Sequence, residues 1–285
     1  MTQRRFIVGS EWIYLKIYSG PKTLEGILMN EMRRKVNALV RRGAVDYYFF
    51  IRYADPEYHI RLRLHCSNKD QYPIVLDEIN ETLSYYAQKL IVPKIQWDTY
   101  VRELERYRGD LIPVFEQLFS YDSRFIMDYL SEVECSDQDR YLVSMKYMDA
   151  LLDQCGMSIK DKIAFTKANR DAYFQEIYKS NEDMGHLLNR KYRPLRKTIS
   201  DLLDQDDPQS KWQRNLRKYM KRIKPLTAKV LQSDSSKEIT SVIHMHVNRM
   251  FRTEQRLSEF VIYWYLHKYY QSKDAMASNA GSKAA

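Results

Sequence analysis

Polar and apolar residues alternate without a break along residues 59–65, His-Ile-Arg-Leu-Arg-Leu-His. Successive side chains of a β-strand point to opposite faces, so the pattern predicts a strand with its three aliphatic side chains in the core. The opposite face carries Arg61 and Arg63, flanked by His59 and His65. Guanidinium groups stay charged at working pH and offer a planar set of donors. This face is therefore either a solvated surface or a rigid platform for an anion.

The chain around this strand shows further periodic segments. Strands are predicted over residues 11–19, 45–53, 59–65 and 91–100, and helices over residues 24–42 and from Asn68 or Asp70 to Lys89. Residues 45–53 are apolar on both faces near their middle, so we expect them to form a central strand. Asp55-Pro56 predicts a turn, which makes residues 45–53 and 59–65 a hairpin. The order strand, helix, strand, strand, helix, strand is typical of a split βαβ, ferredoxin-like antiparallel sheet covered by helices.

From Asp110 onward the periodicity is helical only. Breaks are expected at Pro113, Gly156, Pro194, Pro208 and Pro225. A long last helix is predicted over residues 238–273, followed by a small, polar tail over residues 275–285 that we expect to be disordered. The predicted fold class is α+β. Residues 1–109 hold the sheet, residues 110–274 form a mostly helical part packed on it, and both belong to one continuous catalytic domain.

The 285-residue chain is 44% hydrophobic and 29% charged, which is typical of a soluble globular protein. Its formal net charge of +9 favours an anionic partner or substrate. A basic run over residues 190–224, interrupted by aspartates, is either a solvated face or a face for nucleic acid or peptide. Three cysteines without metal-ligand spacing fit a reduced, cytoplasmic protein. No signal sequence and no apolar run of about 18 residues is present, so no membrane span is predicted.

Two further clusters are candidates for chemistry, and common motifs such as a glycine-rich phosphate loop, HExxH, CxxC and GxSxG are absent. Glu103 and Arg106 are three residues apart and share a face if the segment is helical; the alternative is a solvated surface ion pair. His244 and Asn248 are four residues apart in the predicted last helix and share a face. His244 and His246 diverge by about 200° on a helix, so no metal site is expected from this pair.

Several stretches form a recognisable set in order along the chain. They are Phe49-Phe50-Ile51-Arg52-Tyr53, Asp55-Pro56, His59-Ile60-Arg61-Leu62-Arg63, Asp98-Thr99-Tyr100 with Arg102-Glu103 and Glu105-Arg106-Tyr107, Glu116, Phe119, Asp122-Ser123, and His244-Met245 with Asn248-Arg249. The set spans Trp12 to about Tyr270 and resembles the C-terminal domain of LanB-type lantibiotic dehydratases, also called the thiopeptide-type bacteriocin biosynthesis domain. One departure is Arg108-Gly109, where the family usually has two glycines, and it bears on how a substrate fits this turn.

The resemblance implies a lyase of peptide natural-product (RiPP) biosynthesis that uses no metal or organic cofactor. In LanB dehydratases a separate glutamylation domain uses glutamyl-tRNA to esterify Ser or Thr of a precursor peptide. The domain resembled here then eliminates glutamate and leaves dehydroalanine or dehydrobutyrine. A relative of the same fold makes a pyridine ring from two dehydroalanines by a formal aza-[4+2] cycloaddition. The chain carries no region of the size of a glutamylation domain, so it resembles the split form. Its expected partners are the precursor peptide and a separate glutamylating enzyme. Direct contact with tRNA and a homodimer stay open.

By this resemblance the elimination residues are Arg61, Arg63, Glu103, Arg106 and His244. All five residue types are in place, which favours elimination over pyridine formation. A third alternative, from another class, is a non-catalytic subunit that binds a leader peptide or the partner enzyme. Residues beside these clusters are expected to bind substrate: Arg52, Tyr53, Asn248 and Arg249.

The residue types suit the implied reaction. β-Elimination builds negative charge on an enolate and on the leaving glutamate, and each preorganised donor aimed at such charge contributes about 3 kcal/mol. Arg61 and Arg63 suit the enolate, and Arg106 can hold a carboxylate with two hydrogen bonds. His244 suits proton transfer, because histidine titrates near pH 6.5, at about the pH at which enzymes work. Glu103 either orients an arginine or relays a proton. We expect Arg61, Arg63, Arg106 and His244 to converge on one pocket.

Overall fold

The structure is a computed structural model of the chain, and it describes residues 2–132, 134–178, 182–230 and 235–284. Its fold class is α+β, as predicted. The chain forms two compact units: the first holds Met1–Glu134 and Asn248–Thr253, and the second holds Cys135–Val247 and Glu254–Ala285. Helix α4 (Ile112–Glu132) thus groups with the sheet, whereas the sequence placed a boundary before it.

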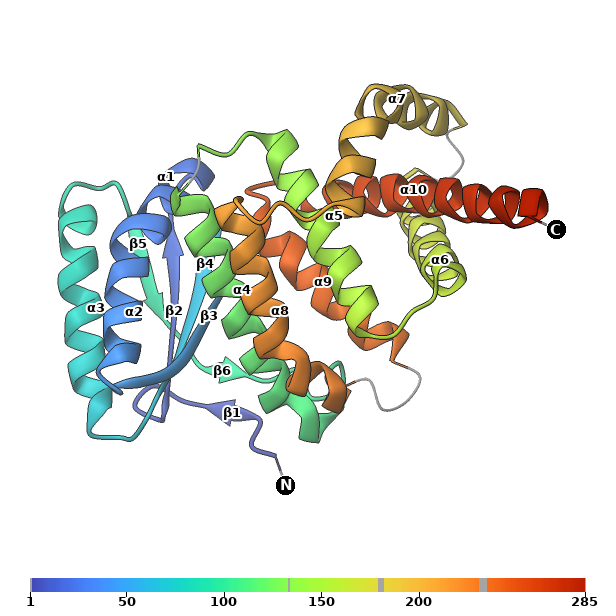
Figure 1. Cartoon of the computed structure of the whole chain (residues 1–285). Coiled ribbons are helices and arrows are strands. Elements are labelled where there is room, and N and C mark those ends of the chain that lie inside the picture. The colour runs from blue at the N-terminus through green and yellow to red at the C-terminus, as the bar shows by residue number, and fades with distance from the viewer. Residues whose placement is uncertain (1, 133, 179–181, 231–234, 285) are drawn as a thin grey trace. The chain divides into compact units, whose positions relative to one another are not determined.

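The first unit is built on a four-stranded antiparallel sheet. Its strands, in spatial order, are β3 (Val45–Tyr53), β4 (His59–Cys66), β2 (Trp12–Tyr18) and β5 (Lys94–Trp97). This order is the predicted split βαβ arrangement. The first crossover consists of α1 (Pro21–Ile27), the π-helical turn η1 (Leu28–Met32) and α2 (Arg33–Arg41); the second is α3 (Gln71–Gln88). Figure 1 shows α2 and α3 side by side next to the sheet, and the aliphatic side of β4 is fully buried.

The arginine strand β4 is central, but the prediction that β3 is central is wrong: β3 lies at the edge. Side chains satisfy the backbone groups that an edge strand leaves unpaired. Ser123 Oγ accepts from Phe50 N at 3.2 Å, and Arg249 Nε donates to Phe50 O at 2.8 Å. The amide of Asn248 accepts from Arg52 N at 2.9 Å and donates to Arg52 O at 2.8 Å. Helix α4 also packs on β3, which explains why this edge strand is apolar on both faces.

The predicted strand over residues 91–100 is divided. Part of it is β5, while β6 (Tyr100–Val101) pairs with β1 (Arg5–Phe6) in a separate two-stranded sheet. Leu90 follows helix α3 with a left-handed φ of 56°, although its side chain is 77% exposed and packs on nothing that would require this backbone conformation. The short 3₁₀ turn η2 (Gly109–Leu111) leads into α4.

The second unit is helical. It contains α5 (Asp137–Gln154), α6 (Ile159–Tyr178), α7 (Glu182–Asp204), α8 (Lys211–Val230), most of α9 (Ser236–Met250) and α10 (Gln255–Ala284). Helix α10 packs along α6. In the described part of the chain, every helix is too short or too polar to cross a membrane.

Three helix predictions are corrected. The single last helix is two helices, because the chain bends between α9 and α10, where Glu254 has a φ of 53°. The tail expected to be disordered continues α10 as far as Ala284. Pro194 and Pro225 lie inside α7 and α8 rather than between helices. Both prolines are exposed, so water can bind the carbonyl group that each leaves without a helical partner.

Candidate functional site

The polar face of β4 lies among aromatic side chains. The sheet register pairs Arg63 with Tyr14 of β2 and Phe49 of β3, and it pairs Arg61 with Lys16 and Ile51. Side chains opposite one another in adjacent strands lie on the same face, so the two arginines share one surface with these neighbours. The alternation in the sequence therefore identified the face, but not what surrounds it.

Arg63 is buried without an anionic partner. Its side chain lies among three rings, with Cζ 4.6 Å from the centroid of Tyr14, 4.9 Å from Tyr100 and 5.3 Å from Phe49. The residue is 8% exposed, and its guanidinium makes no hydrogen bond or ion pair with any residue that the structure describes. Cation–π contacts contribute up to about 2 kcal/mol when desolvated, whereas burial of an ion costs several kcal/mol. The guanidinium is thus only partly compensated and is available to an incoming anion.

Arg61 is held in place by a histidine. Its Nε donates to Nε2 of His59 at 3.0 Å, and its Cζ lies 3.5 Å from the ring centroid of Tyr53. Nδ1 of His59 lies 2.8 Å from the carbonyl oxygen of Glu57, so Nδ1 carries the proton and Nε2 is the acceptor. Burial lowers the pKa of His59, and the charges of Arg61 and Lys16 lower it further, which keeps the ring neutral. The sequence analysis gave His59 no role beyond flanking the arginines; its position two residues before Arg61 was the available signal.

A buried carboxylate fixes one of the rings around Arg63. Glu116 is fully buried and accepts from Tyr100 Oη at 2.7 Å, from Arg102 Nε at 2.7 Å and from Arg102 Nη2 at 2.6 Å. Burial and the neighbouring Glu116 carboxylate raise the pKa of Tyr100, so its hydroxyl stays protonated and acts as a donor. Arg102 is therefore fully paired with Glu116, in contrast to Arg63.

Glu103 and Arg106 form the surface ion pair that the sequence analysis gave as an alternative. They lie in a turn, where Arg106 N donates to Glu103 O at 3.1 Å, and Arg106 Nη1 lies 3.5 Å from Glu103 Oε2. The side chain of Arg106 is 41% exposed and that of Glu103 is 65% exposed. Burial raises the pKa of the adjacent Tyr107 to about 12, while the charges of Arg106 and Arg63 both lower it. The charges of both arginines thus favour the ionised form of the same hydroxyl group, that of Tyr107.

The four residues expected to bind substrate differ in accessibility. Tyr53 is 39% exposed and lies against Arg61. Arg52 is buried, with Nη2 2.7 Å from Glu25 and Nε donating to the carbonyl oxygen of Arg249 at 2.9 Å. Arg249 is also buried and pairs with Asp122 at 2.9 Å. The contacts of Arg52, Arg249 and Asn248 hold the β3 edge together. Substrate binding by these three stays a prediction, which the burial of Arg52 and Arg249 does not support.

In the second unit His244 is paired with a buried carboxylate. Its Nδ1 lies 2.8 Å from Glu259 Oε2; the histidine side chain is 22% exposed and the glutamate is fully buried. A carboxylate on one imidazole nitrogen fixes the tautomer and leaves the other nitrogen, here Nε2, for proton transfer. The charge of Glu259 also adds to the effect of burial in raising the pKa of Tyr173. Glu259 was missed because α10 carries it beyond the helix break, where helical spacing from His244 no longer applies.

The turn before α4 contains Arg108, at the position where the sequence departs from the family pattern. Arg108 has a φ of 51°, in the left-handed region that favours glycine, so the turn keeps a glycine-like shape with a charged side chain. Within the described ranges, no cluster of His, Cys, Asp and Glu has the arrangement of a metal site. Whether Arg61, Arg63 and Arg106 act at the same pocket as His244 stays a prediction.

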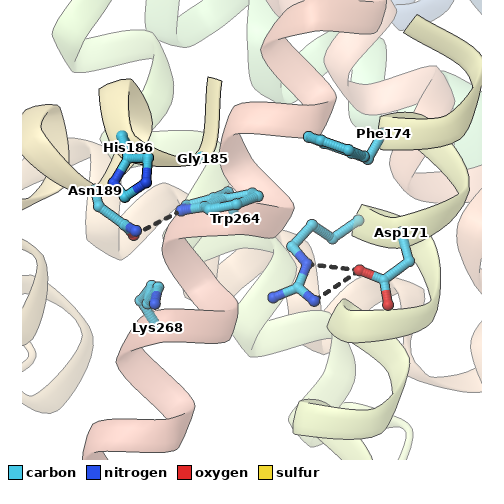
Figure 2. Close-up of a pocket in the computed structure, with 8 residues that line it drawn as sticks. Asp171, Phe174, Gly185, His186, Asn189, Trp264 and Lys268 are labelled. Atoms are coloured by element: carbon cyan, nitrogen blue, oxygen red, sulfur yellow. Dashed lines mark hydrogen bonds and ion pairs between the residues drawn. The ribbon is translucent and has the colours of Figure 1, made fainter. Parts of the chain in front are cut away.

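Two cavities lie within the second unit. Figure 2 shows the smaller one, of about 400 Å³, where the indole of Trp264 on α10 donates to Asn189 of α7 at 3.2 Å. The other, of about 550 Å³, is lined mainly by apolar side chains of α5, α7 and α10. Neither cavity is lined by a residue that was predicted to take part in catalysis or substrate binding, so both are separate from the candidate site.

Two curated proteins are similar in sequence to almost the whole chain. Nisin biosynthesis protein NisB of Lactococcus lactis subsp. lactis is 27% identical over 274 residues, which are 94% of this chain and 26% of NisB. Subtilin biosynthesis protein SpaB of Bacillus subtilis is 25% identical over 273 residues, 92% of this chain and 26% of SpaB. The chain thus spans about a quarter of the length of these curated relatives.

Solved structures share the fold. The tRNA-dependent lantibiotic dehydratase MibB from Microbispora sp. 107891 superposes with a TM-score of 0.60 at 19% identity, over 91% of this chain and 28% of MibB. TbtD, a pyridine synthase from thiomuracin biosynthesis, superposes with a TM-score of 0.67 at 12% identity, over 92% of this chain and 98% of TbtD. The family model for the C-terminal part of lantibiotic biosynthesis dehydratases matches residues 12–270. The chain belongs to the lantibiotic dehydratase C-terminal family.

Proposed function

We propose that the chain is a lyase that eliminates glutamate from glutamylated Ser or Thr of a precursor peptide and leaves dehydroalanine or dehydrobutyrine. Membership of the family supports a role in the maturation of lantibiotic-type peptides. The observation that carries the specific reaction is Arg63, a buried guanidinium among three rings that has no anionic partner among the described residues. Such a group is preorganised for negative charge that arises during a reaction.

The reaction moves one proton and breaks one bond. A base removes the proton on Cα of the esterified residue, the electron pair forms the Cα–Cβ double bond, and the Cβ–O bond breaks to release glutamate as a carboxylate. Charge builds on the neighbouring peptide carbonyl oxygen and on the leaving group. In this proposal Arg63 and Arg61 stabilise that charge, and His59 positions Arg61.

Arg106 and His244 have the remaining roles: one binds the leaving carboxylate and the other transfers the proton. Arg106 is exposed enough to bind a free carboxylate, and its ion pair with Glu103 is 3.5 Å long, which is weak enough to exchange for a substrate carboxylate. In this proposal His244 accepts the proton from the substrate at Nε2, and Glu259 orients the ring by accepting from Nδ1. Glu103 either orients Arg106 or relays a proton.

A pyridine synthase activity is the second candidate. Its support is the fold likeness to TbtD, which superposes with a TM-score of 0.67. The proposed partners in the case of elimination are a precursor peptide and a separate enzyme that glutamylates it.

Incubation of the purified chain with a Ser-glutamylated peptide tests the proposal. We expect mass spectrometry to show loss of glutamic acid and gain of dehydroalanine. Arg63→Gln should slow the loss strongly, and Arg41→Gln, at an exposed arginine of α2, serves as the matched control. A stable ester together with cyclisation of a peptide that contains two dehydroalanines would support the second candidate and reject elimination.

A further inference from the structure

Helix α8 carries most of the excess charge of the chain. Its 20 residues, Lys211–Val230, include eight lysines and arginines and no aspartate or glutamate. The helix thus holds a charge of +8, while the whole chain has a formal net charge of +9. The cations are Lys211, Arg214, Arg217, Lys218, Lys221, Arg222, Lys224 and Lys229, and all eight are exposed.

Few of these charges are neutralised. Arg217 lies 3.5 Å from Asp206, and Arg214 donates to the carbonyl oxygens of Pro208 and Gln209. The side chains of five others make no hydrogen bond or ion pair within the described part of the chain: Lys218, Lys221, Arg222, Lys224 and Lys229. A solvated helix face normally mixes charges of both signs, which limits self-repulsion. On α8 these five cations lie close to one another with no anionic side chain between them.

The eight cations form one face. At about 100° per residue they fall within an arc of about 160°, and they extend over about 27 Å of helix. Only Pro225 and Ala228 interrupt the arc. The opposite face supplies the buried side chains, among them Leu216, Tyr219 and Ile223. Because the apolar face is already buried in the protein, the helix has no apolar face left with which to enter a membrane.

We propose that this face of α8 binds the phosphate backbone of nucleic acid, without reading its sequence. Duplex nucleic acid presents one charge per about 1.7 Å of its axis, so a 27 Å row of cations meets several phosphates at once. Arginine forks and lysine ammonium groups both bind phosphate oxygens. An acidic peptide is favoured less, because the arc offers no apolar side chain larger than proline to anchor peptide side chains, and α8 lines neither of the two cavities. This proposal does not depend on the elimination reaction.

The test is a titration of fluorescent duplex RNA and duplex DNA with the full chain at several salt concentrations. We expect binding with either duplex and a logarithmic salt slope of about −0.9 for each phosphate contacted. The triple variant Lys218→Gln, Lys221→Gln, Arg222→Gln should bind at least about 10-fold more weakly near 0.1 M salt and lose about 2.7 from the slope.

The matched control removes three charges from exposed sites elsewhere, through Lys22→Gln, Lys69→Gln and Lys89→Gln. It should bind like the parent chain. Circular dichroism verifies that both triple variants keep their helices, and single substitutions at Lys218 or Lys221 replace the triple variant if it does not fold. Equal weakening in variant and control would overturn the assignment to α8. Tighter binding of polyglutamate or of anionic vesicles than of either duplex, or no binding of nucleic acid near 0.1 M salt, would overturn nucleic acid as the partner.

Discussion

Substitution of Arg63 by methionine should separate activity from stability. The guanidinium lies among Tyr14, Phe49 and Tyr100 without an acceptor among the described residues, so the fold gains little from its charge. Replacing a poorly compensated buried ion with a hydrophobic side chain of similar volume is often neutral or stabilising by about 1–4 kcal/mol. The lost cation–π contacts offset up to about 2 kcal/mol of that gain. We therefore expect the free energy of unfolding to stay unchanged or to rise slightly.

The rate of elimination should respond in the opposite way. Loss of one preorganised donor to developing negative charge costs about 2.7–4 kcal/mol in the transition state, or a factor of about 10²–10³ in rate. The assay is a single-turnover elimination on a Ser-glutamylated peptide, followed by mass spectrometry, together with a thermal melt of the same preparation. The expected pair of results is slow elimination and an unchanged or higher melting temperature.

Arg102→Met is the matched control on stability. Arg102 makes two hydrogen bonds to the fully buried Glu116, so its loss leaves an uncompensated carboxylate at a cost of about 3–5 kcal/mol. At about 2–4 °C per kcal/mol, the melting temperature should fall by about 6–20 °C. If Arg63→Met lowered the melting temperature as much as Arg102→Met, the reasoning that Arg63 lacks a partner would be refuted. An unchanged elimination rate would refute its proposed role in the reaction.

Three further predictions follow from single residues. Glu259→Gln should slow elimination by about 10²–10⁴-fold, because the amide carries no charge and its NH₂ group can donate to Nδ1, which favours the wrong tautomer of His244. Adding His244→Ala should slow elimination little more, and additive effects of the two substitutions on the rate would contradict the pairing. Leu90→Gly should raise the free energy of unfolding by about 1 kcal/mol in denaturant titrations, since glycine adopts φ 56° without strain. Leu90→Ala should give no gain. A gain from alanine would show that the exposed leucine side chain, and not the backbone conformation, destabilises the chain. Burial lowers the pKa of His267 to about 4, so between about pH 6.5 and pH 4 the unfolded chain binds more protons than the folded chain. The free energy of unfolding should therefore fall by up to about 3 kcal/mol as the pH drops through this window. His267→Gln should flatten the dependence of this free energy on pH, and a dependence that stays steep would exclude His267 as its source.

Local periodicity predicted the parts of the fold that local sequence determines. The alternation in residues 59–65 gave β4 and both its faces, and the order of elements gave the split βαβ sheet. The edge position of β3 could not be read in this way. Its outer backbone groups are covered by Asn248 and Arg249, nearly two hundred residues later in the chain, and α4 buries the side that would otherwise be polar.

The candidate site residues likewise divide into those that local spacing identifies and those that depend on contacts between distant parts of the sequence. Arg61 and Arg63 were found because strand spacing places them on one face. The task of His59 was also within reach of strand spacing, because it lies two residues before Arg61 on the same face of β4. The task of Glu259 depends on a pairing across a helix break, which spacing does not express. That break lacks glycine and proline, so no residue in it signals the end of a helix, whereas Pro194 and Pro225 carry such a signal without effect.

The closure of the β3 edge has a consequence for the order in which the protein is made. Strand β3 leaves the ribosome early, but the amide and guanidinium that seal it belong to residues 248 and 249. Until those residues have been synthesised, the nascent chain carries an open strand edge, the feature through which chains pair with one another and aggregate. The chain between Cys135 and Val247 is translated during this interval. Completion of the first unit is therefore a late event in biosynthesis, although almost all of its sequence comes first.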